Sequence, residues 1–190
     1  MPKASLRENL IAAAVQQFHA HGYAATGVKD ITDAAGAPKG SFYNHFPSKE
    51  ALAVVALERY GETMRLEHLR DSSVAPLTRL REHFESLRDA NVRTEFNRGC
   101  LVGDLTVEVA DHSDSVRATV RDSFQAWSDA LALAIADAQE AGDVAKTLDA
   151  STLARFVLSA WEGALISARA DRSARAFEAF FTVVFGVLLR

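Results

Sequence analysis

Apolar residues recur every three or four positions along most of this chain, which is the spacing of an amphipathic α-helix. In the first segment, Ser5–Ala20, these residues are Leu6, Leu10, Ile11, Ala14, Val15 and Phe18. Ser5 and Glu8 form the S-x-x-E pattern of a capping box, and Gly22 ends the segment. The same spacing predicts further helices at 28–35, 39–46, 49–69, 75–92, 96–110, 113–141, 150–170 and 172–189. The expected fold is therefore all-α, with about nine helices.

Two of the predicted helices are short and are separated by a tight turn. The segment 28–35 stops at Gly36, Pro38 lies in the turn, and the second short helix starts near Lys39. Two such helices form a helix-turn-helix motif, here at about residues 27–46. Ser48 is a suitable N-cap for the next helix. The pattern predicts an N-terminal three-helix DNA-binding domain over residues 4–64, joined by a long helix to a C-terminal helical domain over 65–190.

Composition and charge narrow the class of protein. The 190 residues are 48% hydrophobic and 24% charged, with a formal net charge of −4. Residues 1–50 hold five Lys/Arg and four Asp/Glu, so the average charge of this part neither supports nor excludes nucleic acid. No stretch has the pattern of a signal peptide or a membrane span, which predicts a cytoplasmic protein.

The cysteine and histidine content argues against a metal or cofactor. Cys100 is the single cysteine, which excludes an intrachain disulfide and disfavours a cysteine-based zinc site. The histidines at 19, 21, 68, 83 and 112 have no metal-ligand spacing, apart from the proximity of His19 and His21, which point to different sides of a helix. We therefore expect neither a metal nor a cofactor.

A set of residues around the motif carries a family resemblance. It comprises Gly22-Tyr23, Thr26, Val28-Lys29-Asp30-Ile31, Gly36 and the run from Lys39 to Glu50, KGSFYNHFPSKE. This combination strongly resembles the N-terminal domain of the TetR family of transcriptional repressors, over about the first 55 residues. The resemblance implies a homodimer that binds a palindromic double-stranded DNA operator. One departure is Gly27, where the family often has Ser or Thr.

The residue types of the motif suit contacts with DNA. A helix in the major groove needs small residues where its backbone approaches the bases and donors that reach phosphates. Gly40 and Ser41 supply the small residues. The expected phosphate contacts on this side are Lys39, Tyr43, His45 and Lys49. Thr26 and Lys29 are expected to hold the backbone of the opposite strand, whereas Phe42 and Phe46 share a helix face and are expected to be core residues.

The last two predicted helices, 150–170 and 172–189, are apolar on more than one side. Their apolar residues include Leu153, Phe156, Trp161, Leu165, Phe177, Phe181 and Phe185. An apolar surface this wide predicts a four-helix interface with a second copy of the chain, which is also how the resembled family dimerises. The alternative is that both helices are covered within one chain.

The segment around Cys100 resembles the NemR-like branch of the family, which senses reactive electrophiles and oxidants through a cysteine. Arg98 and a helix N-terminus near Gly99 favour a thiolate at Cys100. The alternative is a buried, inert thiol. Phe96, Trp127 and Trp161 are candidates to line an effector cavity beside it, or else core aromatics.

Three functional hypotheses follow from these patterns. The first is a repressor that is released when a small molecule or an electrophile acts on the C-terminal domain, with the helix 49–69 as the lever. The second is a constitutive DNA-binding protein without an effector. The third, an all-helical enzyme, is disfavoured because no nucleophile, base and orienting acid stand at recognisable offsets and no glycine-rich phosphate loop is present.

Overall fold

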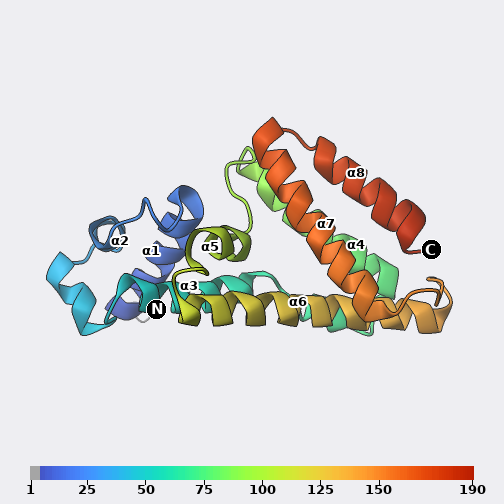
Figure 1. Cartoon of the computed structure of the whole chain (residues 1–190), viewed down its shortest axis with the longest axis horizontal. Helices are drawn as coiled ribbons and strands as arrows, with labels where there is room; N and C mark the ends of the chain where they lie inside the picture. Colours follow the sequence, from blue (N-terminus) through green and yellow to red (C-terminus); the bar gives the residue numbers. More distant parts are fainter. Residues whose placement is uncertain (1–4) are drawn as a thin grey trace. The chain divides into compact units, whose positions relative to one another are not determined.

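The structure, a computed structural model, describes residues 5–190 and confirms the all-α fold (Figure 1). The α-helices are α1 (Leu6–His21), α2 (Val28–Ala34), α3 (Lys49–Thr63), α4 (Pro76–Arg93), α5 (Leu101–Val109), α6 (Asp114–Ala141), α7 (Ala150–Asp171) and α8 (Arg175–Val183). Two short 3-10 helices, η1 (Lys39–Asn44) and η2 (His68–Arg70), and a π-helical turn, η3 (Val184–Leu188), complete the described chain. Within residues 5–190, no helix is long and apolar enough to cross a membrane.

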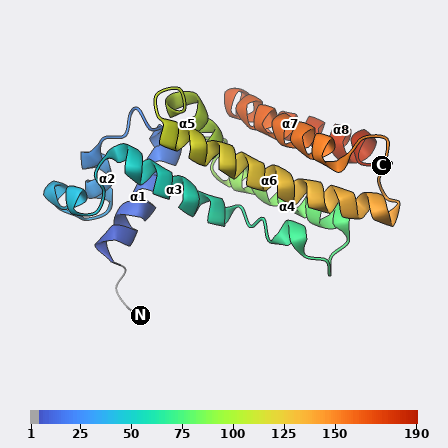
Figure 2. The same ribbon diagram turned by 60° about the horizontal axis from the view of Figure 1, so that its bottom comes forward.

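The chain folds into two compact units. The first consists of the N-terminal part up to Met64 together with Cys100–Ser123, and the second of Arg65–Gly99 together with Phe124–Arg190. The first unit therefore contains α5 and the start of α6 besides the helix-turn-helix, which the predicted division into 4–64 and 65–190 did not include. In the second unit, α7 and α8 pack against each other, as Figure 2 shows.

The core of the first unit is formed by the apolar faces of α1, α2, η1 and α3. Leu10, Phe18, Ile31, Phe42 and Leu52 are fully buried there. The start of α1 is capped as predicted, because the Ser5 hydroxyl accepts a hydrogen bond of 3.3 Å from the Glu8 amide. Gly22 ends α1 with φ +83° and ψ 166°, a region that only glycine adopts at low cost.

Two predicted helices are shorter than expected, and left-handed backbone explains both. The predicted helix 49–69 ends at Thr63, because Arg65 has φ 51° and interrupts the helical path. The predicted helix 96–110 begins only at Leu101, because Glu95 and Phe96 have φ 52° and 59°. The prediction that residues 49–69 form one continuous helix, which would act as a lever, is therefore wrong.

The loop before α5 is held by Arg172. This residue ends α7 in the left-handed conformation, so that the last helix begins at Arg175 rather than at 172. Its guanidinium donates to the Glu95 carbonyl oxygen at 3.2 Å and to the side chain of Asn97. These bonds stabilise the loop in its left-handed conformation.

Candidate nucleic-acid interface

The second helix of the motif, η1, separates buried from exposed aromatics. Phe42 is fully buried, Phe46 is 3% exposed and Tyr43 is 60% exposed. The prediction that Phe42 and Phe46 belong to the core is therefore confirmed. The two buried rings pack with centroids 5.9 Å apart, and the Ser41 hydroxyl donates to the Pro38 carbonyl oxygen at 2.6 Å, which fixes the first turn. Packing below η1 thus determines which side chains point outward.

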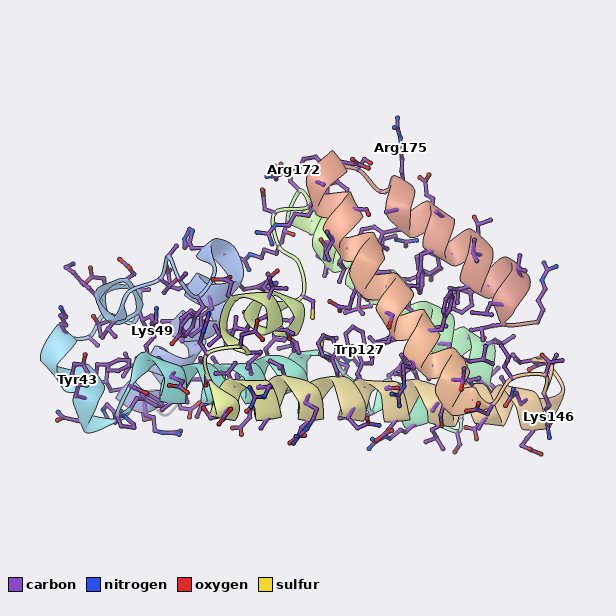
Figure 3. The ribbon with its side chains drawn as sticks, viewed as in Figure 1. Tyr43, Lys49, Trp127, Lys146, Arg172 and Arg175 are labelled. Atoms are coloured by element: carbon purple, nitrogen blue, oxygen red, sulfur yellow. The ribbon has the colours of Figure 1, made fainter. Side chains whose placement is uncertain are left out.

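The exposed side of η1 carries most of the expected DNA contacts. Lys39, Gly40, Tyr43 and His45 are exposed and Ser41 is half-buried. Tyr43 projects from the outer side of η1 (Figure 3). Asn44, also exposed, was not singled out in the sequence, although an amide is the side chain that pairs best with adenine in the major groove. Its place between Tyr43 and His45 was the signal that would have identified it.

The side chain of Thr26, which was expected to contact phosphate, faces the protein interior instead. The residue is 2% exposed, and its hydroxyl donates to the Gly22 carbonyl oxygen at 2.7 Å. The side chain is therefore committed to closing the loop between α1 and α2. Buried hydroxyls need such partners, because an unpaired one would cost free energy.

Lys49 also faces the protein, and it lies between helices of the first unit in Figure 3. Its ammonium donates to the carbonyl oxygens of Tyr23 and Thr26, each at 2.9 Å, and lies 4.0 Å from the centroid of the Tyr23 ring. Burial lowers the pKa of Lys49, while the charge of Glu108 opposes that shift. In this arrangement Lys49 stabilises the loop before α2 instead of reaching outward.

The N-terminus of α2 is capped from inside the helix. Gly27 has no side chain to serve as a cap, and the Asp30 carboxylate accepts a hydrogen bond of 2.8 Å from the Gly27 amide instead. Lys29 is exposed and pairs with Asp33 one turn later. That pairing raises the pKa of Lys29 through the hydrogen bond and the charge of Asp33. The paired ammonium of Lys29 thus lies at the surface of the motif.

Helix α5 contacts the loop between α1 and α2. The Glu108 carboxylate accepts a hydrogen bond of 2.8 Å from the Ala24 amide. It also lies so close to Gly22 that an added Cβ would be 2.6 Å from its Oε1. The positive φ of Gly22 and this close approach both require glycine there. Glu108 was not predicted, because its contact joins residues far apart in the sequence.

The start of α6 holds the start of α3. The Glu50 carboxylate accepts hydrogen bonds from the hydroxyls of Ser113 and Ser115, the latter at 2.9 Å. These bonds lower the pKa of Glu50, because they favour its charged form. The segment 100–123 therefore holds the helix-turn-helix at two points, the loop before α2 and the N-terminus of α3.

The expected effector residues lie in different environments. Cys100 is 5% exposed and occupies the N-cap position of α5 in the first unit. In the second unit, Arg98 is half-buried, and the half-buried Phe96 stacks on Phe177 with centroids 6.5 Å apart.

Both tryptophans lie in the aromatic core of the second unit. Trp161 is fully buried and stacks on Phe177, with centroids 5.0 Å apart. Trp127 is 3% exposed, and its indole N–H donates to His83 Nε2 at 2.9 Å. Among residues 5–190 there is no group of three His, Cys, Asp or Glu side chains that could hold a metal ion.

Family models match both parts of the chain. Residues 10–56 match the model described as bacterial regulatory proteins, tetR family, and residues 76–184 match the tetracyclin repressor-like C-terminal domain. The HTH-type transcriptional repressor DhaR of Mycobacterium sp. (strain GP1) is 35% identical over 192 residues, covering 100% of this chain and 95% of the relative.

Solved structures agree with these matches. The crystal structure of a regulatory protein TetR from Rhodobacter sphaeroides is 33% identical, with a TM-score of 0.87 over 96% of this chain and 98% of that one. The reduced form of Escherichia coli NemR is 27% identical, with a TM-score of 0.81 over 96% of each chain. These relatives are transcriptional regulators rather than enzymes, and this chain belongs to the TetR family of bacterial transcriptional regulators.

Proposed function

We propose that this protein is a repressor that binds a palindromic operator as a homodimer and is released by an effector. Exposure of Lys39, Tyr43 and His45 above the buried pair Phe42 and Phe46 is the observation that carries the DNA-binding part. The proposed contact surface also includes Lys29 at the start of α2, Gly40 and Ser41. Such a regulator would act in the cytoplasm, where the chromosome lies. Because Thr26 and Lys49 are engaged with backbone carbonyls, we assign them to holding the loop that positions α2.

A salt titration with a lysine variant tests this proposal. We expect the full-length protein to shift the DNA upstream of its own coding region in a gel, with an affinity that falls as salt rises. Lys39→Ala removes one phosphate contact from each subunit, so the slope of log K against log salt should become shallower by about 2 for a dimer. The matched control is Lys146→Ala, because Lys146 is an exposed lysine of the second unit that pairs with Glu140. No shift of this DNA at low salt, or equal slopes for all three proteins, would contradict the proposal.

Dimerisation is proposed to use α7 and α8. Phe156 and Ile166 of α7 are 56% and 70% exposed, and Val183 and Val187 near the C-terminus are 52% and 73% exposed. Large apolar side chains gathered on exposed helix faces mark association surfaces. By two-fold symmetry, a dimer on these helices would present two copies of η1 to the two half-sites of a palindrome.

An effector is proposed to act by favouring a state whose recognition helices are wrongly spaced for the operator. One candidate effector is an electrophile that reacts at Cys100, as in the NemR-like branch. The position of Cys100 supports this candidate, since it occupies the N-cap position of α5, the helix whose Glu108 holds the loop before α2. A bulky adduct at the cap would displace α5 from that loop. A noncovalent small molecule that acts on the C-terminal domain is the other candidate effector, and a repressor without any effector is the alternative.

Alkylation tests the electrophile candidate. We expect N-ethylmaleimide to weaken operator binding by about tenfold or more, which corresponds to about 1.4 kcal/mol. The Cys100 sulfur adds to the maleimide double bond, and the added ring does not fit the buried N-cap position. Cys100→Ser should bind DNA as the wild type does and be insensitive to the reagent. An equal loss of binding in the serine variant would remove Cys100 from the mechanism.

A further inference from the structure

Helix α4 carries two buried polar side chains one turn apart in the second unit. Arg79 is 1% exposed and His83 is 4% exposed. Because they stand at positions i and i+4, they share one face of the helix. That face meets the second-unit part of α6, where Asp137 pairs with Arg79 and Trp127 with His83. Figure 3 shows Trp127 projecting from α6.

Only part of the hydrogen-bonding capacity of the Arg79 guanidinium is used. Its Nη2 is paired with the Asp137 carboxylate, whereas Nε and Nη1 are buried without an acceptor among the residues that the structure describes. The side chain of Asp137 is 43% exposed, so water screens much of its charge. The charge of Asp71 also interacts with that of Arg79, so two carboxylates offset part of the positive charge, but the buried Nε and Nη1 still have no acceptor among the described residues. Leaving charged donors unpaired in the interior is costly, which favours an acceptor for them.

His83 adds a third donor. Its Nε2 accepts the indole N–H of Trp127, so that nitrogen carries no proton. Burial lowers the pKa of His83 to about 4, and the ring is therefore neutral near pH 7. A neutral ring with an unprotonated Nε2 carries its proton on Nδ1. Arg79 and His83 together present only N–H donors besides the nitrogen that Trp127 occupies.

We propose that Arg79 and His83 bind the carboxylate of a small organic acid, and that this acid is the noncovalent effector of the repressor. Naming it an effector rests on the proposed function, whereas the binding site rests on Arg79 and His83 alone. A carboxylate supplies charged oxygen acceptors to charged donors, which makes strong hydrogen bonds. A monoanion suits the site better than a phosphate dianion, because Asp137 already neutralises part of the arginine charge. The rings of Phe84 and Trp127, each in edge contact with His83, favour an acid with an apolar body.

Ligand binding can be measured on the full-length protein without DNA. The panel consists of acetate, propionate, butyrate and benzoate, each compared with its amide at matched ionic strength. We expect at least one carboxylate to raise the melting temperature saturably by a few degrees and to change the tryptophan fluorescence, with its amide at least tenfold weaker. A panel without any saturable response, or amides that bind as well as the acids, would overturn the proposal.

Arginine variants assign the response to the site. Arg79→Met keeps the length of the side chain and removes its donors, so the carboxylate response should be lost. Arg93→Met, an exposed arginine in the last turn of the same helix, should keep it. An unchanged response in a folded Arg79→Met protein would overturn the assignment; should that variant not fold, the comparison of acids with amides on the wild type decides.

The role as effector has its own readout. We expect the carboxylate that binds to weaken operator binding in a gel shift by tenfold or more. A carboxylate that binds without changing operator affinity would overturn its role as effector. Failure of the repressor proposal itself would look different, since the protein would then not shift its upstream DNA even without any carboxylate.

Discussion

Phe42→Ala is expected to lower the free energy of unfolding by about 3–5 kcal/mol, whereas Tyr43→Ala should lower it by about 1 kcal/mol or less. Phe42 is fully buried under η1, so its truncation leaves a cavity between η1 and the core of the first unit. Tyr43 is 60% exposed and loses mainly an edge contact with the Phe42 ring, whose centroid lies 5.1 Å away. Urea denaturation followed by circular dichroism measures both values.

Operator binding by the same two variants distinguishes the role of core packing under η1 from that of a direct contact with DNA. We expect Phe42→Ala to lose specific binding, because η1 is too short to hold its shape without the core below it. Tyr43→Ala should remain folded and bind about tenfold more weakly, through the loss of a hydrogen bond to phosphate. Equal stability of the two variants would show that η1 does not depend on its buried ring. Full affinity of Tyr43→Ala would remove Tyr43 from the DNA contacts.

The sequence was sufficient for the parts of the motif that depend on neighbours along the chain. The four-residue spacing of Phe42 and Phe46, with Tyr43 off that face, predicted which rings are buried, because helical period and burial are linked locally. The start of α1 at Ser5 followed in the same way from its capping pattern. Left-handed residues such as Arg65 and Phe96 gave no such signal, since they are not glycines, and both helix boundaries next to them were predicted wrongly.

The roles of Thr26 and Lys49 could not be read from the sequence, because their partners lie elsewhere in the chain. Lys49 binds carbonyl oxygens 26 and 23 residues before it, and Glu108 binds an amide 84 residues before it. A lysine near a helix N-terminus looks the same in sequence whether it faces phosphate or backbone carbonyls. The pairing of Arg79 with Asp137, 58 residues apart, was missed for the same reason.

If the proposed interface is correct, Phe156→Arg is expected to yield a monomer. Phe156 is 56% exposed within one chain, so the substitution should cost the folded subunit little. In a two-fold interface it would remove two buried rings and bury two charges. At about 2 kcal/mol for each ring, the dimer dissociation constant should rise about 1,000-fold. Light scattering after size-exclusion chromatography measures the mass directly.

The control for charge is Val107→Arg, which places the same side chain on α5, where Val107 is 84% exposed and outside the proposed dimer helices. Its mass should stay that of a dimer. Monomeric Phe156→Arg should also bind the operator far more weakly, because each half-site is then bound independently and the effective concentration of the second recognition helix is lost. A Phe156→Arg protein that remains a dimer would refute α7 as the centre of the interface. Weak operator binding by a protein that is still dimeric would instead place Phe156 in the coupling between the two recognition helices.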